Sequence, residues 1–115
     1  MSKINEAKQK LQFADYLLSR NDDAMNKSAL KNIFDAANLA AREFLGNENV
    51  TPALLRLKLD EASKTEQRFS DNFLLLWKMT SENPDKDEIT KAYNRVKSFV
   101  KFVEDRILDS TLEGL

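Results

Sequence analysis

The alternation of apolar and polar residues is most informative between Ala29 and Leu45. Its apolar residues recur with the three- and four-residue spacing of an amphipathic helix, whose apolar stripe is normally buried: they are Leu30, Ile33, Phe34, Ala37, Ala41, Phe44 and Leu45. The same stretch contains four closely spaced alanines, Ala36, Ala37, Ala40 and Ala41. Alanine favours helix, and its small side chain lets the backbone of another helix approach closely. We therefore expect a helix over about 26–45 at the centre of a small helical bundle.

The same periodicity predicts helices at both ends of the chain. A first helix is expected over 3–19, with Ile4, Ala7, Leu11, Ala14 and Leu18 on its stripe and Phe13 and Leu17 widening it. A last helix is expected over 86–109, with the stripe Ile89, Ala92, Val96, Phe99, Val103 and Ile107. The tail after Asp109 is expected to fray.

Between these elements, Thr51-Pro52 is the clearest helix start, because proline is tolerated at the first helical position. A short helix over 52–61 is expected there. The largely polar residues 60–67 leave two alternatives: one continuous helix with an exposed turn, or a break before a separate helix over 64–81. We favour the break.

The expected helix over 64–81 has more apolar residues than one helix face can bury. Phe69, Phe73, Leu76 and Trp77 are predicted to face the core, with Leu74, Leu75 and Met79 beside them. Aromatic residues at this spacing more often belong to a core than to a base-stacking surface. The apolar surplus favours contact with another protein chain.

Capping residues define several helix ends. Asp22, Asp23 and Asn26 are each a possible N-cap of the second helix, and Gly46 is its natural left-handed C-cap. Asp85 is expected to cap the last helix, with Glu88 completing a capping-box-like pair. The short turn near Asp22 makes the first two helices antiparallel neighbours.

Composition supports an all-α fold and excludes several kinds of chemistry. The chain has 115 residues, few enough for one domain over 1–115, and only two glycines and two prolines. It has no cysteine and no histidine, which excludes disulfides, thiolate metal sites and the commonest general base.

With 18 basic and 19 acidic residues the net charge is −1, so no overall electrostatic field attracts nucleic acid or an anionic membrane. The longest apolar run, Phe73 to Trp77, is too short to span a bilayer, and no signal peptide is recognised, so we expect a cytoplasmic protein.

Acidic clusters in the chain have structural explanations. Asp85, Asp87 and Glu88 partly resemble a calcium loop, but Glu88 and Asn94 stand where glycine and glutamate are required, which favours helix capping. Asp60 and Glu61 are adjacent and cannot face each other on a helix. We therefore predict no metal site, no cofactor and no enzymatic activity; an enzyme that uses carboxylates alone is the least favoured alternative.

Basic residues are the remaining candidates for a binding site. Lys91 and Arg95 are four residues apart, as are Lys97 and Lys101, so the last helix carries two short basic rows beside its core stripe. An ordinary solvated surface is favoured, and RNA or nucleotide binding is the alternative. Arg68 is a further basic candidate.

Two segments of the chain together resemble the HEPN family of small helical domains. The segments are ADYLLSRNDDAMNKSALKNIFDAANLAAREFL and AYNRVKSFVKFVEDRIL. The shared features are a first helix ending in Leu17-Leu18, a polar Asn21-Asp22 turn, an alanine-rich second helix with Phe34 near its middle, and the spacing of the last helix. The resemblance covers most of the chain.

This resemblance implies an up-and-down bundle of four to five helices, commonly dimeric, that works with a minimal nucleotidyltransferase or in a toxin–antitoxin pair. Catalytic members of the family cut RNA with an arginine followed by a histidine. Arg68 is the nearest arginine in comparable context, but Phe73, Leu74 and Leu75 stand where that histidine would be. The expectation is therefore a non-catalytic homodimer that binds a partner protein such as a nucleotidyltransferase, with Arg68 and Arg95 as candidates for phosphate binding.

Overall fold

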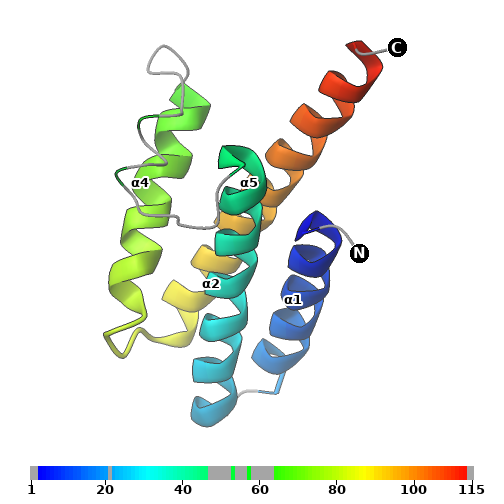
Figure 1. Ribbon diagram of the computed structural model, residues 1–115. Helices are drawn as coiled ribbons and strands as arrows, with labels where there is room; N and C mark the ends of the chain where they lie inside the picture. Colours follow the sequence, from blue (N-terminus) through cyan, green and yellow to red (C-terminus); the bar gives the residue numbers. More distant parts are fainter. Residues whose placement is uncertain (1–2, 21, 47–52, 54–56, 58–63, 114–115) are drawn as a thin grey trace.

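The protein is a bundle of helices. Its computed structural model describes residues 3–20, 22–46, 53, 57 and 64–113. The helices are α1 (Lys3–Leu18), α2 (Asp23–Leu45), α4 (Lys64–Met79) and α5 (Lys86–Glu113), and they run in alternating directions (Figure 1). No strand occurs within these described ranges. The predicted all-α bundle is confirmed.

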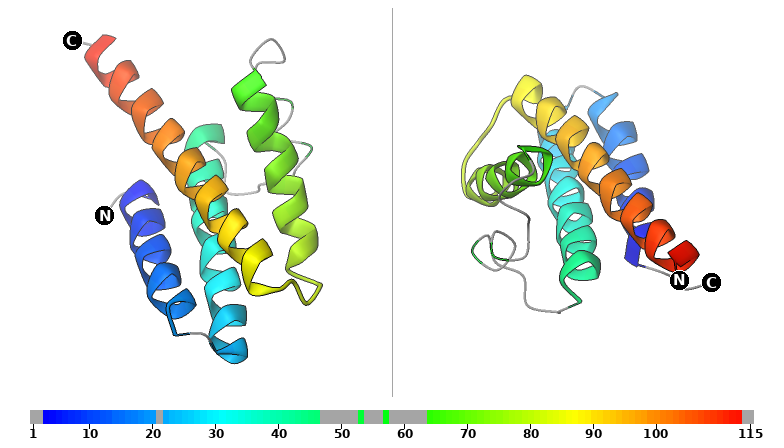
Figure 2. Two further views of the ribbon diagram at one scale, coloured as in Figure 1. Left: turned by 180° about the vertical axis from the view of Figure 1, so that it is seen from behind. Right: turned by 90° about the horizontal axis from the view of Figure 1, so that it is seen from above.

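Helix α2 lies in the middle of the bundle, as its alanine-lined stripe predicted. It contacts α1 on one side and α4 on the other, and α5 packs across all three of these helices (Figure 2). The last turns of α5 project beyond the ends of α1 and α2. Helices α1 and α4 therefore each have a face that no other described helix covers.

All four helices contribute to one hydrophobic core. Its largest fully buried side chains are Ile33 on α2 and Ile89 and Val103 on α5. Five alanines of α2 are almost entirely inaccessible to solvent, and this allows the neighbouring helices to approach closely: they are Ala29, Ala36, Ala37, Ala40 and Ala41. The core depends on close backbone approach at α2 and on large side chains elsewhere.

Helix α2 begins at Asp23, three residues before the expected start near 26. Asp22 is the N-cap, and its carboxylate accepts hydrogen bonds from the backbone N–H groups of Ala24 at 2.9 Å and Met25 at 3.3 Å. At the other end Gly46 has φ 66° and ψ 30°, and its N–H donates to the Arg42 carbonyl oxygen at 2.8 Å. The glycine C-cap is confirmed.

The ends of the other described helices also differ slightly from expectation. Helix α4 ends at Met79 rather than 81, because the hydroxyls of Thr80 and Ser81 donate to the carbonyls of Trp77 and Lys78. Helix α5 continues to Glu113, four residues past the expected end at 109, since no glycine or proline occurs between Lys86 and Glu113. The prediction of a frayed tail after Asp109 is wrong for residues 110–113.

The start of α5 follows the capping prediction. The Asp85 carboxylate accepts a hydrogen bond from the Glu88 N–H at 2.9 Å, which satisfies one of the unpaired donors of the first turn. The predicted helix over 52–61 lies outside the described residues except for Ala53 and Leu57, both helical and exposed. Residues 60–63 of the predicted break lie outside them too, and residues 64–67 are part of α4.

Four aromatic residues do not occupy the buried positions predicted for them. Trp77 is 40% exposed, and Met79 is buried in its place with Phe69, Phe73 and Leu76. Phe13 does not widen the buried stripe of α1 but is 52% exposed. Phe34 is only partly buried, as are Phe44 and Leu45. The reason is the position of the neighbours: α1 is covered on one side only, and α4 turns Met79 toward the core and Trp77 toward its edge.

Candidate functional site

The basic residues predicted as a phosphate or RNA site lie on two helices. Arg68 is exposed on α4, while Lys91, Arg95, Lys97 and Lys101 follow one another on α5. Arg95 and Lys97 point about 200° apart, because each helical residue turns by about 100°. Arg95 faces α4, whereas Glu104, on the side of Lys97, forms an ion pair with Lys8 of α1. The two basic rows of α5 therefore border different helices and do not form one patch.

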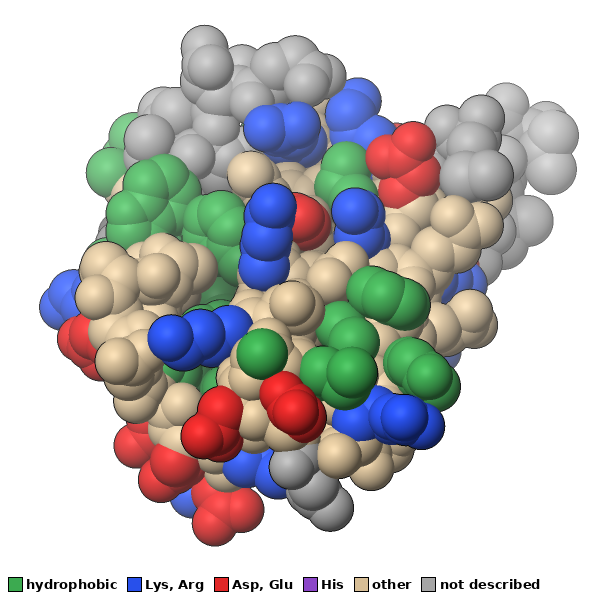
Figure 3. Space-filling view, turned by 90° about the horizontal axis from the view of Figure 1, so that it is seen from below, with side chains coloured by type: hydrophobic (Ala, Val, Ile, Leu, Met, Phe, Trp, Pro, Cys, Tyr) green, Lys and Arg blue, Asp and Glu red, His purple; other side chains and the backbone are tan. Residues whose placement is uncertain are grey.

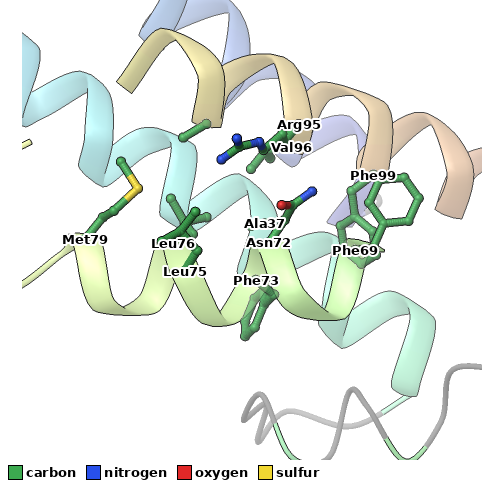
Figure 4. Close-up of a pocket in the computed structure, with 11 residues that line it drawn as sticks. Ala37, Phe69, Asn72, Phe73, Leu75, Leu76, Met79, Arg95, Val96 and Phe99 are labelled. Atoms are coloured by element: carbon green, nitrogen blue, oxygen red, sulfur yellow. The ribbon is translucent and has the colours of Figure 1, made fainter. Parts of the chain in front are cut away.

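Arg95 lies in a narrow crevice between α4 and α5, together with Asn72. Both side chains point into the space between the helices (Figure 4). The remaining walls are apolar and include Leu75, Leu76 and Met79. The free volume is about 20 Å³, enough for roughly one water molecule, whereas small-molecule pockets occupy about 300–1,000 Å³. The crevice is too small for a nucleotide.

A much larger depression, which we call the hollow, lies where the start of α2 meets the connection between α4 and α5. Its volume is about 990 Å³, and it is open to solvent. The partly buried ring of Phe34 lines it, and behind it lie the buried core residues Leu30 and Ile89, which are 6% and 1% exposed. The remaining residues that line the hollow are polar, charged or turn residues: Asp23, Asn26, Lys27, Lys31, Asp35, Thr80, Ser81, Glu82, Asn83, Pro84, Asp85 and Lys86.

Charges of both signs surround the hollow. Lys27, Lys31 and Lys86 supply positive charge, and four carboxylates oppose them: these are Asp23, Asp35, Glu82 and Asp85. The Asn26 side-chain oxygen is buried and accepts no hydrogen bond from the described residues. A polyanion would meet the four carboxylates, so this mixed surface suits a protein segment better than a nucleic acid.

An aromatic cluster adjoins the hollow. Phe34, which lines the hollow, meets the Trp77 ring edge-on at 5.7 Å and stacks on Phe73 at 6.4 Å between ring centroids. Phe73 is buried and holds the cluster against the core, while Trp77 remains 40% exposed. Leu74, three residues before Trp77 on α4, is also exposed. The cluster extends the hollow with an apolar surface.

A second exposed aromatic pair occurs on α1. Phe13 and Tyr16 are 52% and 55% exposed and stack at 6.3 Å between centroids, and the Arg20 guanidinium lies 5.8 Å above the Tyr16 ring. Viewed from below, hydrophobic side chains gather on the α4 side and again on the α1 side (Figure 3). The sequence interpretation missed this pair, although the spacing 13, 16, 20 already places the residues on one helix face.

The acidic residues of the described part of the chain bear on the possibility of a metal site. No three carboxylates there come close enough to hold a metal ion together. Burial, and secondarily the negative charge of Asp15, raises the pKa of the Tyr93 phenol. Tyr93 therefore stays protonated at neutral pH and is not a general base.

Comparison with known proteins identifies no relative of this chain. No protein-family model matches the chain, and no curated protein or solved structure matches it significantly. Among the described residues, no helix combines the length and apolar character needed to cross a bilayer. The resemblance to the HEPN family stays a prediction.

The alternative of RNA binding is tested by substituting one basic residue on each side of α5 and comparing the RNA affinities of the two variants. We expect Arg95→Ala and Lys97→Ala to leave the RNA affinity at low salt unchanged, because neither residue belongs to a continuous basic surface. The measurement is a salt titration of RNA binding. A loss confined to Arg95→Ala, with a salt slope reduced by about one, would instead support a phosphate contact at the crevice.

Proposed function

We propose that the protein is a non-catalytic helical bundle that forms a homodimer and binds a partner protein through the hollow. The observation that carries this proposal is the combination of an open depression of about 990 Å³ with an adjoining, 40% exposed tryptophan. Tryptophan is enriched among the residues that dominate binding energy at protein interfaces. The partly exposed ring of Phe34, which lines the hollow beside Trp77, suits an apolar side chain of the partner.

The charges around the hollow support a protein as the occupant. Lys31 and Asp35 both line it and lie one turn apart on α2, so a partner segment with charges of both signs finds complementary groups there. Asp35 also lies 4.0 Å from the Lys10 ammonium, an ion pair at the limit of direct contact that a partner can exchange. The family resemblance suggests a minimal nucleotidyltransferase as the partner.

The test is whether the protein binds a minimal nucleotidyltransferase, measured by isothermal titration calorimetry. We expect Trp77→Ser to weaken binding by about tenfold or more, since it removes the exposed ring beside the hollow. Lys31→Glu is expected to weaken binding as well. Both side chains are exposed, so the helical circular dichroism is expected to stay unchanged.

Lys97→Glu is the matched control for Lys31→Glu, because it makes the same charge change on α5, outside the hollow. We expect it to leave the affinity within about twofold of the unmodified protein. If the nucleotidyltransferase does not bind, or if Lys97→Glu weakens binding as much as Lys31→Glu, the proposed function is wrong.

A further inference from the structure

The outward face of α1 carries a self-complementary row of side chains, which we call the α1 stripe. It consists of Glu6, Gln9, Phe13, Tyr16 and Arg20, all of them exposed. Buried Ala7, Leu11 and Ala14 occupy the opposite face, so the stripe points away from the bundle. Arg20 lies two residues beyond the end of α1 at Leu18 but belongs to the stripe, because its guanidinium lies over the Tyr16 ring.

The order of residues along the α1 stripe is symmetric about Phe13. Glu6 stands seven residues before Phe13, and Arg20 stands seven residues after it. Seven residues are close to two helical turns, so Glu6 and Phe13 occupy nearly the same angular position, and the Arg20 guanidinium reaches this face over the Tyr16 ring. The stripe therefore has an acid at one end, a base at the other and an aromatic ring at its centre.

We infer that a second copy of this chain packs on the α1 stripe, with the two α1 helices antiparallel about a two-fold axis at Phe13. This arrangement places Glu6 of each copy opposite Arg20 of the other and brings the Phe13 rings together. Gln9 lies opposite Tyr16 of the other copy, where amide and phenol can form a hydrogen bond. A contact of this kind is closed and uses the same surface on both copies.

The charges also determine the direction of the pair. A parallel arrangement would put Glu6 beside Glu6 and Arg20 beside Arg20, and like charges facing each other oppose association. Within one copy Glu6 and Arg20 are about 20 Å apart along the helix, too far for an ion pair. A direct ion pair between Glu6 and Arg20 is therefore possible only between two copies.

The size of the surface predicts the strength of association. One helix face covers less than the roughly 1,200–2,000 Å² buried in a stable interface of standard size. We therefore expect a dissociation constant of about a micromolar or weaker. The inference rests on the homodimer of the proposed function and specifies which surface forms it.

A charge-swap experiment tests the pairing, with the weight-average mass measured by sedimentation equilibrium over a wide concentration range. The unmodified protein is expected to rise from 13.2 kDa toward twice that mass. Glu6→Arg alone and Arg20→Glu alone each create like-charge pairs and are expected to weaken the dimer by about tenfold or more. The double variant restores opposite charges between copies and is expected to return within about threefold of the unmodified protein.

Phe13→Ala serves as a second variant that keeps both charges and removes the central ring. It is expected to weaken the dimer, whereas Leu75→Ala, an exposed apolar residue on α4, is expected to leave the dimer intact. A monomer at every concentration would overturn the inference. So would a dimer that the single charge variants do not weaken or the double variant does not restore.

The two proposals fail in different ways. Loss of the dimer in Phe13→Ala with nucleotidyltransferase binding retained supports the α1 contact independently of the hollow. An intact dimer in Phe13→Ala, in a protein that still binds the nucleotidyltransferase through Trp77, overturns the α1 contact and leaves the partner-binding role of the hollow in place.

Discussion

Replacing Phe69 with alanine is expected to lower the free energy of unfolding by about 3–5 kcal/mol. Phe69 is buried, and its ring centroid lies 5.0 Å from that of Phe99 and 5.3 Å from that of Phe102. The substitution removes these contacts between α4 and α5 and leaves a cavity. Since small domains are stable by only about 5–15 kcal/mol, this is a large fraction of the total.

Urea denaturation measures this effect as a shift of the midpoint at constant slope. Leu74→Ala is the matched control on the same helix, because Leu74 is 39% exposed. We expect that control to cost less than about 1 kcal/mol. An equal loss in the two variants would mean that the aromatic contact does not anchor α4 to α5.

Replacing Ala40 with leucine is expected to destabilise the bundle by about 1–3 kcal/mol, for the opposite physical reason. Ala40 is completely buried on α2, whose alanines allow the neighbouring helices to approach closely. The larger side chain has no space unless the helices move apart, and this separation loosens packing along the whole interface. The change is measurable as a lower midpoint of thermal unfolding.

Ala24→Leu makes the same substitution at an exposed position in the first turn of α2. It is expected to change the stability by no more than about 0.5 kcal/mol in either direction. A comparable loss at Ala24 and Ala40 would indicate an effect of helix propensity rather than of close packing, and would contradict the role given to the buried alanines.

The hollow and the α1 stripe lie on different parts of the bundle. The hollow combines Phe34 with charges of both signs near the α4–α5 connection, and the α1 stripe lies on an outward helix face. The two proposals therefore assign them different roles.

The candidate site was less predictable than the fold. The residues that line the hollow come from the first three turns of α2, the segment 80–85 and the start of α5, and no local pattern relates these segments. The spacing of Lys91, Arg95, Lys97 and Lys101 predicted two rows on α5. The sequence did not reveal that Arg95 faces α4. It also did not reveal that the Lys101 Nζ atom lies 3.6 Å from Asp105 Oδ2, one turn further along α5.

By itself the sequence determined the helices, most of their ends and most of the core, because helical periodicity and capping depend on residues close together in the chain. Gly46 and Asp85 cap as predicted, and the alanine stripe of α2 is central. Only the tertiary structure decided which apolar side chains stay at the surface. Trp77 and Met79 are both compatible with the edge of the α4 stripe, and the positions of α2 and α5 bury Met79 and leave Trp77 beside Phe34. The physical reason is that periodicity orients residues around one helix axis, whereas burial depends on which other helices lie against it.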